Sequence, residues 1–94
     1  MTRTYFACRW QHDLPDEPVE LYGELDEQRW QLRKVEVFRD GRTVILGPND
    51  IEQGATALDE APVPPFSEIA ADPQFEPREI TAEEFEAIWR RHPK

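Results

Sequence analysis

Residues 29–47 read RWQLRKVEVFRDGRTVILG, the longest run of the chain that is rich in β-branched and aromatic residues. Such side chains favour strands because they fit a pleated, half-buried surface. Asp40-Gly41 divides the run, and Gly41 can supply the positive φ that a tight turn needs. The stretch therefore predicts a β-hairpin, around which the other elements are arranged.

Two registers of this hairpin are compatible with the sequence. A two-residue turn at Asp40-Gly41 pairs Val37 with Val44. A three-residue loop with a bulge at Gly41 pairs Val37 with Thr43 instead. The residue types do not choose between these registers.

The first strand of the hairpin has a break in its pattern. Trp30 and Leu32 are at even positions, whereas Val35 and Val37 are at odd positions, and a strand cannot bury both pairs on one face. Either a bulge lies near Arg33-Lys34, or the strand is covered on both faces. A bulge could re-aim Arg33 and Lys34 for a function, or it could simply bend the sheet around its core.

Two more strands are predicted before the hairpin. Residues 3–11 alternate between faces and place Phe6 and Cys8 on the apolar one. Residues 19–25, VELYGEL, favour a second strand, although the three-residue spacing of their apolar positions leaves a helix open. Gly23 and the preceding proline weigh against that helix.

The last third of the chain predicts a helix. Thr81 and Glu84 have the spacing of a capping box, and Phe85 and Trp89 begin an apolar face. Before it, residues 61–78 predict a Pro-rich, irregular connection with one short helical turn at 66–71. The predicted fold class is α+β: an antiparallel sheet of about four strands within residues 1–60, with a C-terminal helix (81–92) packed on one face. We expect residues 1–94 to form a single domain.

Charge limits the classes of partner. The chain has 20 acidic and 11 basic residues, a net charge of −9 and a pI of about 4.6. Phosphate backbones and anionic membranes should repel it, so we expect no nucleic acid or membrane as a partner. A basic protein is the predicted partner, although acidic residues also simply promote solubility.

Seven acidic residues precede the basic hairpin and are the candidate partner-binding residues. They are Asp13, Asp16, Glu17, Glu20, Glu24, Asp26 and Glu27. Neighbouring antiparallel strands would bring them beside the bases of residues 29–42, so they either form cross-strand ion pairs or leave an acidic rim for a partner.

No catalytic, cofactor-binding or metal-ligating residue is predicted. Cys8 is expected to be a small buried hydrophobic residue. His12 and His92 could join it as soft ligands, but their spacing matches no metal signature. With a single cysteine, no apolar run of about 18 residues and no leader pattern, the chain is expected to be cytoplasmic.

The run DEPVELYGELDEQRWQLRKVEVFRDGR resembles a family of small, acidic, uncharacterised bacterial domains with a DEP–LY–ELDE–R–RKVE–FRDGR core. Its later segment, with the pattern EI–ADP–FEP–I–EEF–W, is similar to the same family. The resemblance implies a stand-alone cytosolic bacterial domain. It implies no activity and no site residue.

Three functions remain open. The first is an acidic protein-binding module, most concretely an immunity-like neutraliser of a basic toxin or nuclease. The second is a small-ligand-binding or enzymatic domain that uses a face of the sheet lined by Trp10, Tyr22 or Trp30. The third is an accessory subunit of a larger assembly, for which an exposed Trp89 would be the sign.

Overall fold

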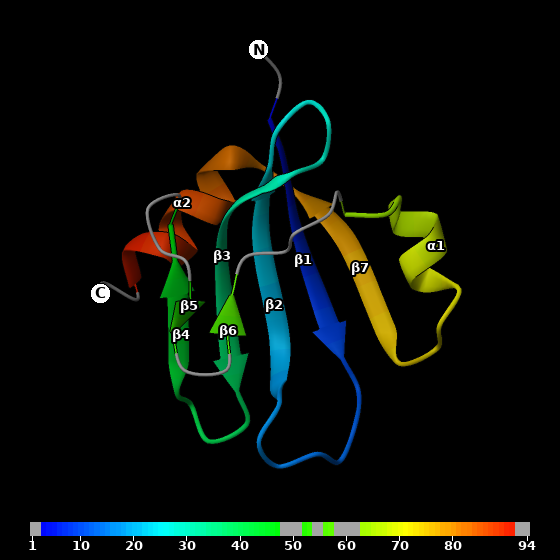
Figure 1. Ribbon diagram of the computed structural model, residues 1–94, viewed down its shortest axis with the longest axis vertical. Helices are drawn as coiled ribbons and strands as arrows, with labels where there is room; N and C mark the ends of the chain where they lie inside the picture. The colour runs from blue at the N-terminus through cyan, green and yellow to red at the C-terminus, as the bar shows by residue number, and fades with distance from the viewer. Residues whose placement is uncertain (1–2, 48–51, 54–55, 58–62, 92–94) are drawn as a thin grey trace.

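The computed structural model describes residues 3–47, 52–53, 56–57 and 63–91. Its elements are β1 (Thr4–Trp10), β2 (Pro18–Leu25), β3 (Gln31–Phe38), β4 (Thr43–Leu46), β5 (Glu52–Gln53), β6 (Thr56–Ala57), α1 (Phe66–Ala70), β7 (Phe75–Ile80) and α2 (Ala82–Arg91). Within these residues, five antiparallel strands form one sheet in the order β4-β3-β2-β1-β7. The strands β5 and β6 form a separate pair (Figure 1).

The β3–β4 hairpin has the three-residue loop. Val37 is paired with Thr43, and Gly41 has a φ of 93°. The Asp40 carboxylate accepts a hydrogen bond from the Arg42 N–H at 3.0 Å. This contact spans the left-handed Gly41 residue, so the side chain of Asp40 itself stabilises the longer loop.

The expected bulge is present in β3. Glu24 of β2 is paired with Arg33, while the following residue, Leu25, is paired with Gln31. Leu32 is therefore the extra residue of the strand. The sheet is also covered on both faces, so the two explanations of the broken apolar pattern hold together.

Two apolar clusters lie on opposite faces of the sheet. The cluster on the α1 side contains Phe6, Cys8, Leu25 and Val63. The cluster on the α2 side contains Ala7, Ile80 and Phe85. In Figure 1, α2 lies behind the upper half of the strands. The sheet is thus the middle layer of the molecule.

In the cluster on the α1 side, the Phe6 ring packs closely against the backbone of the neighbouring strand β2. Gly23 is paired with Phe6 across β2 and β1. A Cβ atom at Gly23 would lie 2.4 Å from Phe6 Cε1 and 2.8 Å from Phe6 Cζ. The Phe6 ring therefore occupies the space that any larger residue at position 23 would need.

The sheet has one strand more than predicted. Residues 75–80, expected to be part of an irregular connection, form the edge strand β7 and pair with β1, with Tyr5 opposite Ile80. Pro77 argued against a strand, but it is tolerated because an edge strand pairs on one side only. The helical turn expected at 66–71 is α1 (Phe66–Ala70).

Helix α2 begins as predicted. The Glu84 N–H donates to Thr81 Oγ1 at 3.1 Å, and the Thr81 N–H donates to Glu84 Oε1 at 3.2 Å. These reciprocal bonds are the capping box. Phe85 is fully buried, and its ring lies 5.4 Å from that of Tyr5 on β1. His92, the last residue of the predicted helix, lies outside the described residues.

Candidate functional site

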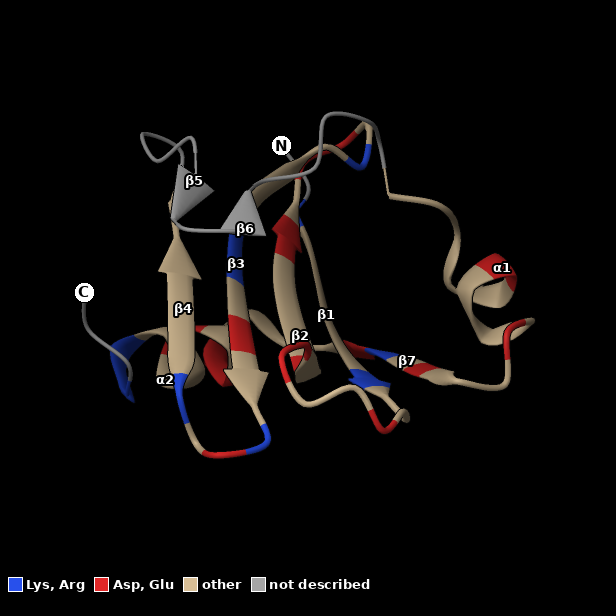
Figure 2. Ribbon diagram, turned by 60° about the horizontal axis from the view of Figure 1, so that its bottom comes forward, with Lys and Arg blue, Asp and Glu red and all other residues tan. Residues whose placement is uncertain are grey.

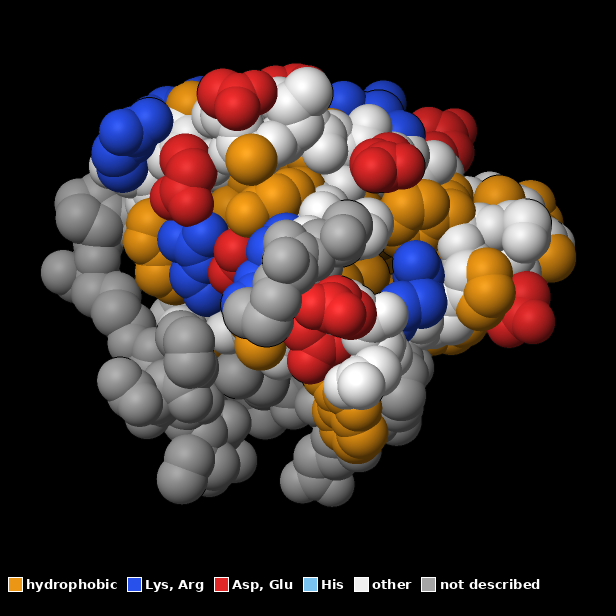
Figure 3. All heavy atoms as spheres, turned by 90° about the horizontal axis from the view of Figure 1, so that it is seen from above, with side chains coloured by type: hydrophobic (Ala, Val, Ile, Leu, Met, Phe, Trp, Pro, Cys, Tyr) orange, Lys and Arg blue, Asp and Glu red, His pale blue; other side chains and the backbone are white. Residues whose placement is uncertain are grey.

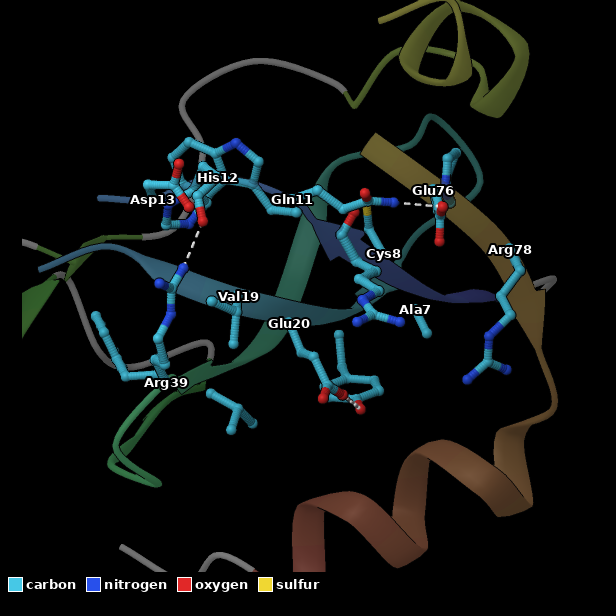
Figure 4. A pocket seen from close by; sticks show the side chains of 16 residues that line it. Ala7, Cys8, Gln11, His12, Asp13, Val19, Glu20, Arg39, Glu76 and Arg78 are labelled. Atoms are coloured by element: carbon cyan, nitrogen blue, oxygen red, sulfur yellow. Dashed lines mark hydrogen bonds between the residues drawn. The ribbon is translucent and has the colours of Figure 1, made fainter. Parts of the chain in front are cut away.

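A hollow lies where α2 leaves its face of the sheet uncovered. It has a volume of about 1030 Å³. Strands β1, β2, β3 and β7 and the β1–β2 loop contribute its walls. The polar side chains that line it include Arg9, His12, Asp13, Glu20, Tyr22, Arg39, Glu76 and Arg78. Figure 4 shows Arg78 and Glu20 extending to the same side of the strands.

Tyr22 lies on the floor of this hollow. Its hydroxyl donates a hydrogen bond to Glu20 Oε2. Burial, followed by the Glu20 carboxylate, raises the pKa of Tyr22 to about 12, against a smaller opposing effect of Arg78 and Arg91. Tyr22 is therefore a neutral donor at physiological pH, and a base of ordinary strength would not deprotonate it.

The β1–β2 loop forms one end of the hollow and is held by His12. The Leu14 N–H donates to His12 Nδ1 at 2.9 Å, and His12 Nε2 lies 2.8 Å from Pro18 O. Because Nδ1 accepts from the Leu14 N–H, Nε2 is the nitrogen that can donate to Pro18 O. Arg39 donates to His12 O, which fastens the loop to the β3–β4 hairpin. The loop presents Leu14 with 52% of its surface exposed.

The seven predicted partner-binding acids do not form one patch. Asp13 and Glu20 line the hollow, and Asp16 and Glu17 are exposed in the loop beside it. Asp26 and Glu27 lie in the β2–β3 turn at the opposite end of β2. Figure 2 shows acidic positions at both ends of this strand, and Figure 3, seen from the β2–β3 end, shows acidic and basic side chains interspersed.

Glu24 is the one predicted acid that is buried. It accepts hydrogen bonds from Arg33 Nε at 2.7 Å and from the Tyr5 hydroxyl at 3.0 Å. Asp26 serves the turn, because its Oδ1 accepts from the N–H groups of Gln28 and Trp30. The cross-strand pairing considered for these acids is therefore real at Glu24, and an acidic rim remains only around the β1–β2 loop and Glu20.

The two basic residues at the bulge have structural partners. Arg33 binds both Glu24 and Glu86. Lys34 Nζ lies 3.5 Å from Glu36 Oε2, and both of these side chains are buried. This pair borders a second cavity of about 410 Å³ on the α1 side of the sheet. The bulge thus directs charges into ion pairs rather than into the large hollow.

The aromatic residues proposed for a ligand site are separated. Trp10 and Tyr22 line the large hollow. Trp30 is 41% exposed and follows the β2–β3 turn, at the other end of β2. Trp89 is half-buried, with its ring 6.2 Å from that of Phe85 and 4.8 Å from the guanidinium of Arg33.

The potential soft metal ligands are not brought together. Cys8 is buried on the α1 side of the sheet, and burial raises the pKa of its thiol. His12 uses both ring nitrogens within the β1–β2 loop. Among the described residues, no group of three or more His, Cys, Asp or Glu side chains could hold a metal ion. No helix in the same part of the chain is long and apolar enough to cross a membrane.

A family model matches residues 4–94, and its description is "Domain of unknown function (DUF6881)". The chain belongs to this family. The match confirms membership of an uncharacterised domain family, as the residue pattern suggested. No curated protein and no solved structure is significantly similar to this DUF6881 domain. Its function must therefore be inferred from its own geometry.

Two residues of the DUF6881 domain were missed in the sequence. Arg9 and Arg78 both line the hollow, yet they lie near opposite ends of the chain. The available signal was the alternation of residues 3–11, which places Arg9 opposite to Cys8. Without the strand β7, nothing in the sequence placed Arg78 next to it.

Proposed function

We propose that the DUF6881 domain is an acidic protein-binding module, most concretely an immunity-like neutraliser of a basic toxin or nuclease in the bacterial cytoplasm. The observation that carries this proposal is the β1–β2 loop. There, exposed Leu14 is flanked by Asp13, Asp16 and Glu17 on a backbone that His12 holds in place.

A fixed loop of this kind suits a protein interface. Pre-organisation lowers the entropy that must be lost on binding. An apolar anchor such as Leu14 can enter a pocket of the partner, while charged neighbours form the rim. The net charge of −9 would steer a basic partner toward the domain. A nuclease surface built for phosphates offers the complementary charge.

The proposal narrows the predicted surface to one end of the molecule. Asp13, Asp16, Glu17 and Glu20 belong to it. Glu24 is excluded by its burial, and Asp26 and Glu27 lie too far along β2 to share the same contact. The free, buried Cys8 is consistent with a reducing cytoplasm, which supports this location.

The test uses the intact domain as bait for proteins of the native host, followed by binding measurements on the purified partner. The loop variant combines Asp13→Asn, Asp16→Asn and Glu17→Gln. It should raise the Kd for a basic partner at least about tenfold at low salt, since each lost charge removes a rim contact with the partner. The partner's toxic or nuclease activity should be inhibited by the unmodified domain.

A control variant removes the same charge from exposed positions elsewhere. It combines Glu27→Gln, Glu79→Gln and Glu83→Gln. This variant should bind as the unmodified domain does. Equal losses in the two variants would mean that net charge alone acts, and unchanged affinity in the loop variant would overturn the proposed surface.

A second candidate function is favoured by the hollow itself. About 1030 Å³ lined by Trp10, Tyr22 and charged side chains is sufficient for a small organic ligand. In this alternative the domain binds a small molecule on the uncovered half of the sheet. Ligand-induced NMR shifts confined to residues of the hollow would test it, and their absence across a chemically diverse library would contradict it.

A further inference from the structure

Two arginine side chains share the floor of the hollow. Arg9 of β1 lies opposite Glu76 of β7, and Ala7 of β1 lies opposite Arg78. Because alternate residues of a strand point to the same face, Arg9 and Arg78 extend from neighbouring strands on the same side of the sheet. Both residues are exposed. Ala7, which is opposite Arg78, also lines the hollow.

The acids next to Arg9 are occupied elsewhere. Glu20, its cross-strand neighbour on β2, accepts a hydrogen bond from the Tyr22 hydroxyl. Glu76, its neighbour on β7, accepts one from Gln11 Nε2, as the dashed line in Figure 4 shows.

The side chains of Arg9 and Arg78 have no hydrogen bond, ion pair or ring contact to any other described residue. The remaining arginines of the sheet and its turns do have such partners: Arg29, Arg33, Arg39 and Arg42. With 20 acidic residues in the chain, two neighbouring guanidinium groups that form no ion pair with a described residue stand out from the surface around them.

We propose that Arg9 and Arg78 form the binding site for a small organic carboxylate. A guanidinium group donates two parallel hydrogen bonds to a carboxylate, and two such groups on adjacent strands can hold one carboxylate between them. The inference rests on the second candidate function, the use of the hollow by a small ligand, and is independent of the acidic loop.

The local charge gives a dianion little advantage. Glu20 and Glu76 flank the two arginines, so the site is close to neutral before a ligand binds. The second charge of a phosphate dianion doubles its attraction to the two guanidinium groups but also doubles its repulsion by the two acids. The Tyr22 ring offers an apolar surface for the body of the ligand, which favours an aromatic or aliphatic acid over acetate.

The experiment titrates the labelled full chain with phenylacetate, acetate and inorganic phosphate at constant pH and ionic strength. NMR signals of the arginine Nε–H groups and of the Tyr22 ring report binding. Phenylacetate should shift the signals of Arg9, Arg78 and Tyr22 with saturation, and it should bind more tightly than acetate or phosphate. Arg9→Gln and Arg78→Gln should each weaken binding at least about tenfold, the size expected for a lost charged hydrogen bond.

Arg3→Gln is the matched control. Arg3 is an even number of residues from Arg9 and carries the same charge, but it directly precedes β1, at the opposite end of the strand from Arg9. Its replacement should leave the affinity unchanged. Phenylacetate binding at Tyr22 that persists in both Arg9→Gln and Arg78→Gln would overturn the carboxylate site while leaving a small-ligand function in place. No shift of any hollow signal would overturn both, and tighter binding of phosphate would overturn the preference for an organic carboxylate.

Discussion

Arg33 of β3 and Glu86 of α2 are joined by two parallel hydrogen bonds, from Nη1 to Oε1 at 3.2 Å and from Nη2 to Oε2 at 2.6 Å. The same guanidinium donates to Glu24 through Nε. It also lies 4.9 Å from the ring of Phe85 and 4.8 Å from that of Trp89. The Arg33 side chain thus holds α2 against one half of this face of the sheet. The other half of the face remains uncovered.

The first prediction concerns the stability that this clamp provides. Arg33→Ala should lower the free energy of unfolding by about 3 kcal/mol, because Glu24 would remain buried without its counter-charge. Glu86→Gln should cost roughly 1 kcal/mol, since its side chain is 40% exposed. Urea unfolding followed by tryptophan fluorescence measures both. The exposed change Glu79→Gln should stay within about 0.5 kcal/mol, and a similar value for Arg33→Ala would contradict the clamp.

The same ion pair predicts a loss of stability in acid. Arg33 lowers the pKa of Glu86 below its ordinary value of 4.5, so the folded state favours the ionised carboxylate more than the unfolded state does. This contribution is complete above pH 4.5 and is lost as the pH falls through the lowered pKa. Stability below this pH should fall more steeply in the unmodified domain than in Glu86→Gln, and parallel profiles would show that the pair contributes nothing.

The Gly23 position should not accept alanine. The added methyl group would collide with the Phe6 ring, and we expect a loss of about 1–3 kcal/mol from overpacking. Phe6→Leu removes the ring atoms concerned, so Gly23→Ala should cost less in that background than in the unmodified domain. A double-mutant cycle from urea unfolding gives the coupling energy. Additive effects would mean that the ring does not cause the loss.

His12→Ala should loosen the β1–β2 loop without unfolding the sheet. The Leu14 N–H would lose its acceptor, so hydrogen exchange at this amide should become about ten times faster or more. Such an increase is expected when a hydrogen bond that opposed local opening by about 1 kcal/mol or more is lost. Amides of β2 should exchange at their former rates. Asp13→Asn alters the same loop without touching these bonds and serves as the control. Unchanged exchange at Leu14 would show that His12 does not hold the loop.

Tyr22 should ionise at unusually high pH. Its pKa of about 12 lies above the ordinary value of 10.0, so its contribution to stability is complete below pH 10.0 and is lost as the pH rises toward 12. In a Tyr5→Phe background, ultraviolet absorbance of the tyrosinate follows Tyr22 alone. Glu20→Gln should move the transition toward 10.0, because a negative acceptor is replaced by a neutral one. An unchanged pKa in Glu20→Gln would mean that burial alone raises the pKa of Tyr22.

Local signals predicted most of the elements but not their assembly. The capping box at Thr81 and Glu84 and the Asp40-Gly41 turn are read from adjacent residues, and both are present. The strand β7 was missed because Pro77 and its charged neighbours do not have the composition of a strand. They are stable there because the pairing with β1, a contact between distant parts of the chain, outweighs local preference.

The candidate site was predicted less well than the fold. Seven acids that are close in the sequence were expected to act together, but the eight-residue strand β2 separates them. Conversely, Arg9 and Arg78 meet only because β7 returns to the first strand. A site assembled across strands depends on register and on strand order, and neither is encoded in the spacing of residues along the chain.

The place of β1 between β2 and β7 has a consequence for synthesis. A ribosome releases the first strand long before residues 75–80 exist, so one edge of β1 stays unpaired until these residues have been made. An unpaired edge readily joins another chain. A product that stalls before β7 would therefore be prone to aggregation or degradation, and a cell would accumulate the domain only in its finished form.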